Sequence, residues 1–420
     1  MVRFARIRRG GRAGSDGWTD RGAPGVSRSR FSWFRRVQKK IDWTFYVRLA
    51  VSGDEPTGRT PSGDLGERIR ALGYALGFDR VGICSAEPGP DTEFVRDWIA
   101  SGHGGEMGYL ARRLDERVDP RRLLPGAQSI VSVGLFYGDA AGETPPSQQP
   151  AGIQSEASVS CYAGGDDYHD VLGDRLRSLE AALPSLAGAP VRSRAYVDTG
   201  PVLERVHAAR AGLGWIGKNT CLIDPTLGSY LFLGALLTDL ALLPDRPEPD
   251  HCGTCRACLD ACPTDAFPEP YVLDARRCLS YTTIELRGPV PEDLREATAD
   301  RLHGCDVCQE VCPWNTRERR RTPGDPLGLR TRMAQRDPWR RPDLAWLLAL
   351  DEEGWRRTTR RTALRRPGLR GMLRNALVAA GNSGDLSLVP AIRRHSEGGD
   401  SMLAEHARWA LARLDSASRA

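Results

Sequence analysis

Long apolar runs are missing from this sequence. No stretch reaches the roughly 18 consecutive apolar residues from which a transmembrane helix is inferred. The longest run, 230–243, is interrupted by Thr238 and Asp239, and we expect it to form a buried strand and the turn after it. The first 60 residues also lack the apolar core and small-residue cleavage site of a secretory signal. We therefore expect a cytoplasmic protein with no membrane association.

Lysine is almost absent as well. Only Lys39, Lys40 and Lys218 are lysines among the 59 basic residues, and all the others are arginines. A site that requires a slender ammonium group rather than a planar guanidinium would explain why Lys218 is retained. Chance retention is the alternative. The first interpretation predicts a functional contact for Lys218.

The N-terminal 60 residues differ in composition from the rest. They contain 14 Lys or Arg against five Asp or Glu, a net charge of +9, whereas the whole chain carries +5. This segment is rich in Gly, Ser and Arg and has little periodicity, so 1–62 is predicted to be a disordered basic arm. A start of the protein near Gly63 is the alternative.

Apolar patterns along the rest of the chain predict an α+β multidomain protein. Helices are expected over 64–76, 92–100, 168–182 and 201–211, and strands over 80–85, 129–137, 192–197, 220–223 and 229–237. Asp64 is the expected N-cap of the first helix, and Pro201 is expected in the first turn of the last. Strands and helices alternate, which predicts an α/β or α+β domain over 63–245. The Pro- and Ser-rich segment 142–155 is expected to be a surface loop.

The C-terminal part has a helical pattern. An Arg- and Pro-rich linker is expected over 317–342. Three blocks with helical period follow, at 344–350, 372–380 and 403–414. The segments 370–382 and 404–414 share a basic residue near the start, an Ala-rich face and Leu anchors, which predicts a HEAT-like helical domain over 343–420.

Cysteine carries the strongest chemical signal. Eight of the eleven cysteines lie between 252 and 312, and such clustering favours metal binding over disulfides. The first run, Cys-x2-Cys-x2-Cys-x3-Cys-Pro, begins at Cys252, and the second, Cys-x2-Cys-x3-Cys-Pro, begins at Cys305. In two-cluster ferredoxins the last cysteine of such a run binds the other cluster. We therefore predict a ferredoxin-like module with two [4Fe–4S] clusters over 246–316.

Crossing the last cysteines between the runs uses all eight. The second run lacks one ligand, and Cys278 is the unassigned cysteine that can supply it. The first cluster then takes Cys252, Cys255, Cys258 and Cys312. The second takes Cys262, Cys278, Cys305 and Cys308. Zinc is the alternative, but three cysteines at successive two-residue gaps followed by Cys-Pro fit zinc poorly.

The first domain contains weaker candidates. Gly212-x4-Gly217-Lys218-Asn219 nearly matches a phosphate-binding P-loop, but it has Asn219 where Ser or Thr would hold magnesium, so the turn is expected to present Lys218 to another ligand. Asp198 follows a strand and is either a catalytic carboxyl with a raised pKa or a helix N-cap. Cys84 and Cys221 are expected in the core, and His169 is expected to be a structural histidine.

The order of these motifs resembles the epoxyqueuosine reductase family. The resemblance rests on 196–205 (YVDTGPVLER), 212–220 (GLGWIGKNT), 228–234 (GSYLFLG) and the two cysteine runs with 278–285 (CLSYTTIE) between them. It extends over roughly 63–415. The basic arm and the loop 142–155 lie outside it.

The resemblance implies an activity and its cofactors. Such an enzyme reduces epoxyqueuosine to queuosine at the wobble position of tRNA anticodons, with cobalamin and two [4Fe–4S] clusters. The first domain would be an α/β cobalamin-binding domain, and the HEAT-like domain would help to hold the tRNA. Asp198 matches the family's proton donor, and Cys161 matches the cysteine that lies against the cobalt. Further cofactor contacts are implied for Arg117, Lys218, Asn219, Ser229 and Ser280.

One departure from the family pattern is Gly164-Gly165, where Trp-Gly is frequent. A lost aromatic side chain there is expected to loosen the packing over the cofactor.

The chemistry agrees with the resemblance. Removal of an epoxide oxygen requires two electrons and protons, which an external low-potential donor, the clusters and Asp198 would supply. The base must leave the anticodon stack to reach the site. Arg-rich segments at 317–341 and 356–374 are expected to bind RNA phosphates, unless they are simply solvated faces. A monomer is expected. Alternatives are another cobalamin and iron–sulfur enzyme, such as a reductive dehalogenase, and an electron-carrier protein.

Overall fold

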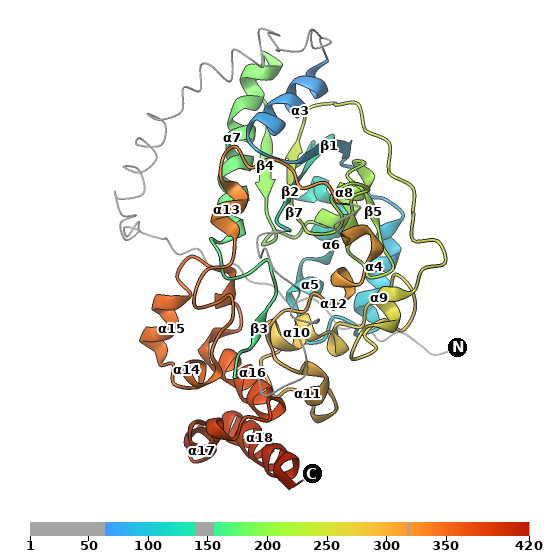
Figure 1. The fold of residues 1–420 in the computed structure, drawn as a ribbon. Helices are drawn as coiled ribbons and strands as arrows, with labels where there is room; N and C mark the ends of the chain where they lie inside the picture. The colour runs from blue at the N-terminus through green and yellow to red at the C-terminus, as the bar shows by residue number, and fades with distance from the viewer. Residues whose placement is uncertain (1–63, 139–154, 317–319, 420) are drawn as a thin grey trace, which may run out of the picture. The chain divides into compact units, whose positions relative to one another are not determined.

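The structure is a computed structural model that describes residues 64–138, 155–316 and 320–419 (Figure 1). The predicted basic arm, 1–62, and nearly all of the predicted loop 142–155 lie outside these residues. Helices and strands are both present, as the sequence predicts. Across the described ranges, no helix is both long and apolar enough to cross a membrane.

A four-stranded sheet forms the centre of the first part. Its order is β1 (Arg80–Ser85), β2 (Ser129–Phe136), β7 (Leu231–Thr238) and β4 (Ser193–Tyr196). Every residue of β2 is buried, because both faces of the sheet are covered. All three pairings are antiparallel, a direction that the alternation of elements alone does not reveal.

Helices cover the two faces of this sheet. On one face, α7 (Tyr168–Ala187) brings Leu176 against Gly234 of β7. On the other, α8 (Glu204–Arg210) and the turn after it approach β1 so closely that a Cβ at Gly82 would lie 2.1 Å from the carbonyl oxygen of Ala211. Gly82 is therefore required by the packing of α8.

The predicted elements are present with shifted ends. Asp64 caps α3 (Leu65–Ala75) by accepting a hydrogen bond of 3.3 Å from the Gly66 N–H. The predicted helix 201–211 begins only at Glu204, so the expectation that Pro201 lies in its first turn is wrong. A turn occupies the preceding residues, in which Asp198 has a left-handed φ of 56°. This turn frees Asp198 from the role of helix N-cap.

Short elements complete the fold. The strand pairs are β5 (Trp215–Ile216) with β6 (Leu222–Ile223), which is antiparallel, and β3 (Ser158–Val159) with β8 (Arg301–His303), which is parallel. The other helices are α4 (Asp91–Ala100), α5 (Tyr109–Arg112), α6 (Leu114–Val118), α9 (Ala257–Asp260), α10 (Leu279–Ile284), α11 (Glu292–Thr298), α12 (Val307–Glu310), α13 (Leu329–Met333), α14 (Leu344–Leu348), α15 (Glu352–Thr358), α16 (Gly368–Asn382), α17 (Val389–Ser396) and α18 (Ser401–Arg419).

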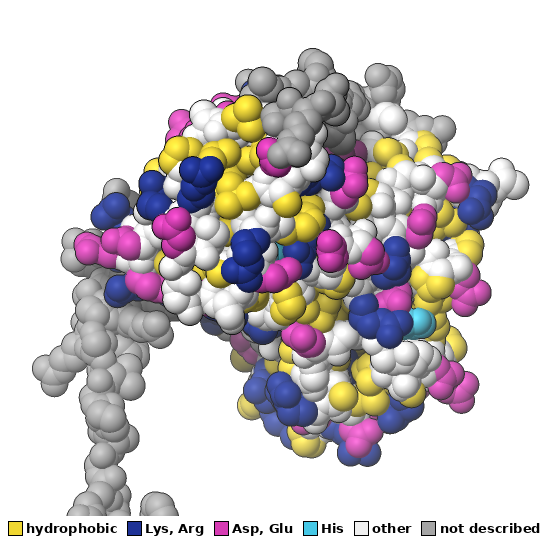
Figure 2. All heavy atoms as spheres, turned by 90° about the horizontal axis from the view of Figure 1, so that it is seen from below, with side chains coloured by type: hydrophobic (Ala, Val, Ile, Leu, Met, Phe, Trp, Pro, Cys, Tyr) yellow, Lys and Arg dark blue, Asp and Glu magenta, His cyan; other side chains and the backbone are white. Residues whose placement is uncertain are grey.

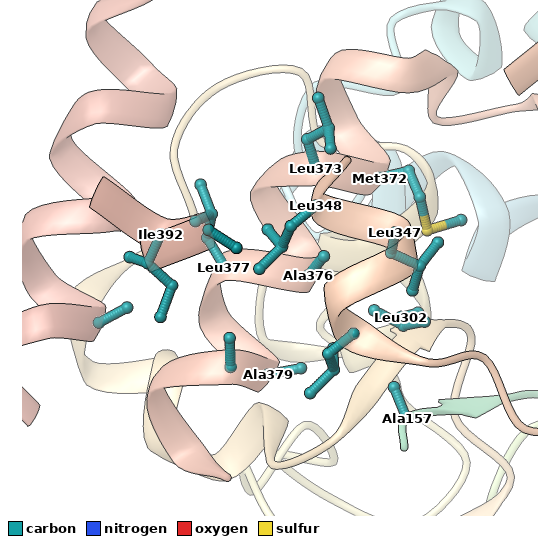
Figure 3. Close-up of a cluster of buried hydrophobic side chains, with 14 of the residues drawn as sticks. Ala157, Leu302, Leu347, Leu348, Met372, Leu373, Ala376, Leu377, Ala379 and Ile392 are labelled. Atoms are coloured by element: carbon teal, nitrogen blue, oxygen red, sulfur yellow. The ribbon is translucent and has the colours of Figure 1, made fainter. Parts of the chain in front are cut away.

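The C-terminal helices share a core with earlier parts of the chain. All three predicted helical blocks are helices, and α16 packs against α14 and α18. Figure 3 shows Leu377 of α16 beside Ile392 of α17 in this core. Ala157 and Leu302 belong to the same cluster of buried side chains. The predicted boundary at 343 therefore does not coincide with a break in the hydrophobic core.

A buried arginine joins α16 to the cysteine-rich segment. Arg374 is fully buried, and its guanidinium donates to the carbonyl oxygens of Thr282, Leu286 and Gly288 at 2.6–2.9 Å. Asn375 donates to the carbonyl oxygens of Thr283 and Leu302. Because buried carbonyl groups need partners, these two side chains fix α10 and the end of its loop onto α16.

Candidate functional site

The first three cysteines of the first run line a cavity together with one cysteine of the second run. Cys252, Cys255, Cys258 and Cys312 line a cavity of about 190 Å³. This is the first predicted set, with its fourth member crossed from the second run. All eleven cysteines are free thiols. No three or more His, Cys, Asp or Glu side chains within the described ranges are arranged to hold a single metal ion.

The other four cluster cysteines are also neighbours. Burial raises the pKa of Cys278, and the nearby Cys262 acts in the same direction. Burial raises the pKa of Cys305 to about 11, and Cys278 contributes to that shift as well. Cys308 interacts with both Cys278 and Cys305. These contacts bring the second predicted set together.

Lys218 contacts the loop of the first cavity. Its ammonium donates hydrogen bonds to the carbonyl oxygens of Gly253, at 2.6 Å, and Cys255, at 2.8 Å. Lys218 also lines the cavity beside Asn219. The ammonium fits between two carbonyl groups of a tight loop, which agrees with a need for a slender cation.

Three other expected cofactor contacts also touch the cysteine-rich segment. Asn219 donates to the carbonyl oxygen of Cys308 at 3.1 Å. The Ser229 hydroxyl donates to the side-chain oxygen of Gln309 at 2.9 Å. Ser280 donates from its backbone and its hydroxyl to the Cys278 sulfur. The structure thus gives these residues contacts that position the cluster ligands.

Asp198 lies in a network with the start of α7. Its carboxylate accepts a hydrogen bond of 3.0 Å from Nε2 of His169, whose Nδ1 donates to Asp167 at 2.6 Å. The Tyr168 hydroxyl donates to Asp198 as well, and the Tyr168 ring stacks on Phe232 with centroids 4.3 Å apart. The Asp198 side chain is 61% exposed, so a substrate can reach it.

The electrostatics of this network differ from the expectation. Partial desolvation by the surrounding protein opposes ionisation of the solvent-facing Asp198 carboxylate, but hydrogen bonds from His169 and Tyr168 outweigh it, so its pKa lies below the usual value. Burial also disfavours the His169 cation, yet its bonds to Asp167 and Asp198 raise its pKa to about 9. The expectation of a raised pKa at Asp198 is therefore wrong, and the network holds its proton on His169 at neutral pH.

Arg117 and Glu204 carry buried polar atoms near Asp198. Nε of Arg117 and Oε1 of Glu204 are buried without a hydrogen-bond partner. Burial raises the pKa of Glu204 to about 8, and Asp198 contributes to the shift. Both groups require a partner, and the amide side chains of a corrin would supply donors and acceptors. These residues therefore fit a cobalamin.

Cys161 is placed by the cysteine-rich segment. Its backbone N–H donates to Asp306 at 2.8 Å. Burial, and then the Asp306 carboxylate, raise the pKa of the Cys161 thiol well above its usual value, so it is a neutral thiol at pH 7. Asp306 directly follows Cys305, so this hydrogen bond places Cys161 beside the second predicted set of ligands.

The remaining cysteines differ from each other. Cys84 is 2% exposed in the core, as expected, and burial raises its pKa to about 11. The expectation that Cys221 belongs to the core is wrong, because it is partly exposed and its thiol is hydrogen-bonded to that of Cys308.

Glycine in place of tryptophan at 164 does not leave loose packing in the described structure. Gly164 has a φ of +94°, and a Cβ there would lie 3.0 Å from Trp339. A Cβ at Gly165 would lie 2.0 Å from the carbonyl oxygen of Met333. Trp339 and its neighbours thus fill the space beside both glycines.

Exposed arginines lie beside the Asp198 network. Arg357, Arg360, Arg361 and Arg365 are exposed and form no ion pair with described residues. The carbonyl oxygen of Arg361 accepts a hydrogen bond of 2.8 Å from Asp167. Lys and Arg side chains alternate with acidic ones on the face in Figure 2, so cations are not continuous there. We call 356–366 the basic strip.

Comparison with known proteins identifies the family. The family model "Epoxyqueuosine reductase QueG, DUF1730" matches residues 117–199, and "4Fe-4S double cluster binding domain" matches 251–315. The epoxyqueuosine reductase of Xanthomonas campestris is 41% identical over 352 residues, covering 83% of this chain and 96% of that protein. The chain belongs to the epoxyqueuosine reductase family. The epoxyqueuosine reductase of Gloeobacter violaceus is 43% identical to this chain, covering 76% of this chain and 96% of that protein.

Solved epoxyqueuosine reductases have the same fold. One, determined with an epoxyqueuosine-modified stem loop of tRNA-Tyr, is 30% identical with a TM-score of 0.74, covering 83% of this chain and 90% of that one. Another, from Bacillus subtilis, is 29% identical with the same TM-score and coverage, and is described with its catalytic aspartate loop swung out of the active site. The mixed helix-and-strand fold and the double-cluster module expected from the resemblance are confirmed.

Sequence reasoning missed two residues of the epoxyqueuosine reductase site. His169 is a fully bonded histidine, as expected, but one of its partners is Asp198. Glu204 lies in the same motif as Asp198 and is not among the predicted site residues, yet burial raises the pKa of its carboxyl to about 8. The nearby N-cap residue Asp167 is a local signal for one hydrogen-bond partner of His169. The other partner, Asp198, lies 29 residues away, and no local pattern indicates it.

Proposed function

We propose that this enzyme reduces epoxyqueuosine to queuosine in the wobble position of tRNA anticodons, with Asp198 as the proton-delivering group. The observation that carries the proposal is the Asp198–His169 pair at 3.0 Å, on a carboxylate that solvent reaches. Family membership supports the oxidoreductase activity, the two [4Fe–4S] clusters and the cobalamin. The dehalogenase and electron-carrier alternatives are not favoured.

The residues of the network move and hold a proton. His169 is protonated at neutral pH, since its pKa is about 9, and it shares a hydrogen bond with Asp198. As negative charge develops on the departing oxygen, the proton held on His169 would pass to the Asp198 carboxylate and from there to that oxygen, leaving His169 neutral. Asp167 holds the imidazole in place at 2.6 Å. When bound, the clusters and cobalamin supply the two electrons.

We assign the proposed cofactor contacts in two groups. Arg117 and Cys161 face the cobalamin together with Asp198. Lys218, Asn219, Ser229 and Ser280, which were expected at the same cofactor, support the cluster ligands with the hydrogen bonds described above. The eight cluster cysteines bind in the two crossed sets, and the cavity shared by Cys312 with the first run supports this division.

The basic strip would hold the RNA backbone near Asp198. Its arginines lie in the last turn of α15 and in the residues after it. Arg366 pairs with Glu285 at 2.8 Å and lies 5.6 Å from the Tyr109 ring centre. Arg366 also lowers the pKa of Asp198 through its charge. A phosphate bound along the strip would therefore place an unstacked base close to the carboxylate.

The domain boundaries are part of the proposal. We retain a cobalamin-binding domain over 63–245, a two-cluster domain over 246–316, a linker over 317–342 and a HEAT-like tRNA-binding domain over 343–420. Ala157, Leu302 and α16 share one core, so the C-terminal domain packs firmly against the earlier parts of the chain. We also propose a monomer in the cytoplasm that takes electrons from an external low-potential donor.

The test uses protein reconstituted without oxygen, with cobalamin and a reductant, acting on tRNA that contains epoxyqueuosine. Asp198→Asn should lower turnover by about 10²–10⁴-fold, the usual contribution of a positioned acid, with iron content unchanged. Asp170→Asn is the matched control, because Asp170 is an exposed carboxylate on the same helix as His169. Full turnover by Asp198→Asn would refute the role of Asp198, and an inactive wild-type protein would refute the function.

A further inference from the structure

Trp215 has a buried donor without a partner. The residue is 3% exposed, and its indole Nε1 has no hydrogen-bond partner in the protein. An indole nitrogen can only donate, and a buried donor left unpaired costs free energy. An acceptor for this group must therefore come from the side chains or the bound group immediately around it.

The surroundings of Trp215 direct it toward the first cluster cavity. It packs with Cys312 and Cys252, two of the cavity's four cysteines. The rings of Trp314 and His251 hold it edge-on, with centroids 5.0 and 4.9 Å away. Sulfur of the cluster shell is thus the acceptor in reach of the indole.

Lys218 adds a positive charge to the same cavity. Two of its three ammonium donors are used by the carbonyl oxygens of Gly253 and Cys255. A carboxylate of opposite charge lies on the same loop, at Asp250, which accepts from the Cys252 N–H at 2.7 Å. Lys218 is the one lysine after residue 40, so no other ammonium group in the described chain can replace it.

A cluster with four thiolate ligands is negatively charged and becomes more so when it is reduced. Hydrogen bonds to its sulfur atoms and nearby cations therefore stabilise the reduced form and raise the reduction potential. We propose that Trp215 and Lys218 are positioning residues that raise the reduction potential of the first cluster, through an indole N–H bond to its sulfur shell and through the ammonium charge. This proposal rests on the double-cluster module and holds whichever substrate is reduced.

The location of the first cavity gives this tuning a purpose. Cys255 is exposed, whereas Cys305 and Cys308 of the second set lie beside Asp306, which binds Cys161. The first cluster is therefore the one that faces an external donor. A raised potential there makes it the acceptor for electrons entering the protein.

The test is a redox titration of the reconstituted protein, followed by electron paramagnetic resonance and run without tRNA. Trp215→Phe keeps the ring and removes the N–H, and Lys218→Met removes the charge. Each should make reduction of one cluster about tenfold less favourable, a shift of about 59 mV for one electron, and leave the other cluster unchanged. Lys218→Arg keeps the charge but fits less well between the two carbonyl oxygens, so it should recover part of the loss, and Trp409→Phe, on α18, should shift neither.

The iron content of each variant is measured first, so that a changed potential refers to intact clusters. Unchanged potentials in Trp215→Phe and Lys218→Met, with full iron content, would overturn the proposal, as would an equal shift of both clusters. If Trp215→Phe does not retain iron, the comparison of Lys218→Met with Lys218→Arg decides, and equal potentials in these two would overturn it. A loss of tRNA turnover alone would bear on the proposed function and not on this tuning.

Discussion

Replacement of His169 by Gln should change stability in a pH-dependent way. Glutamine is neutral, so it can hydrogen-bond to Asp167 and Asp198 but cannot attract them as a cation. In the native protein those two bonds raise the pKa of His169 from 6.5 to about 9. At 1.36 kcal/mol per pKa unit, the interaction is worth roughly 3 kcal/mol. Solvent at the exposed Asp198 screens part of it, which leaves about 1–2 kcal/mol.

The sign follows from the raised pKa. Because the folded-state pKa exceeds the unfolded one, the contribution is complete below pH 6.5 and is lost as the pH rises through 9. Asp167 and Asp198 have lowered pKa values, so their side of the same interaction is lost as the pH falls below about 3.8. The difference between wild type and His169→Gln should therefore be largest near pH 5–6.

The assay is thermal unfolding of the reconstituted protein, at one scan rate and without oxygen, between pH 5.5 and 9.5. A difference of 1–2 kcal/mol corresponds to a shift in Tm of about 2–8 °C for domains of 150–250 residues. We expect a lower Tm for His169→Gln at pH 6 and nearly equal values at pH 9.5. Asp170→Asn should give a difference that does not vary with pH. A constant difference for His169→Gln, or one that grows with pH, would refute the assigned charge on His169.

Three further changes test other parts of the structure. Arg374→Met should lower the free energy of unfolding by about 3–5 kcal/mol, because it leaves buried carbonyl groups unpaired; denaturant unfolding measures this, and a loss below 1 kcal/mol would contradict it. Cys262→Ser should lower the iron bound by the second set, to which Cys262 and Cys305 belong, and leave the electron paramagnetic resonance spectrum of the first cluster intact. Loss of the first cluster would refute the crossed assignment. Gly165→Ala should destabilise the fold, since its Cβ would meet the Met333 carbonyl oxygen at 2.0 Å; an unchanged Tm would show that the loop can shift.

Local patterns were sufficient for most of the elements. Strand β1 has its predicted bounds. Asp64 is the N-cap of α3, as predicted. The crossed cysteine sets remain a prediction from the count and spacing of the cysteines, and the cavity that Cys312 shares with the first run agrees with it. Antiparallel pairing of β2 with β7 depends on contacts between distant segments, which periodicity does not contain.

The chemistry of individual side chains was less predictable for the same reason. A raised pKa was expected at Asp198, but its value depends on His169, which comes from another element. Lys218 was recognised by its rarity, whereas its partners, Gly253 and Cys255, lie across the fold. Protonation and hydrogen bonding are set by neighbours in space, so they required the structure.

The shared C-terminal core also constrains the order in which the protein can be made. Ala157, near the start of the second described segment, packs in the same core as α16 and α18, which are synthesised much later along the chain. Contacts between such distant segments form late and slowly. The segment around Cys161 must therefore wait until α16 and α18 have been synthesised before its final packing. Cofactor loading near Cys161 before that point would take place in an incomplete site.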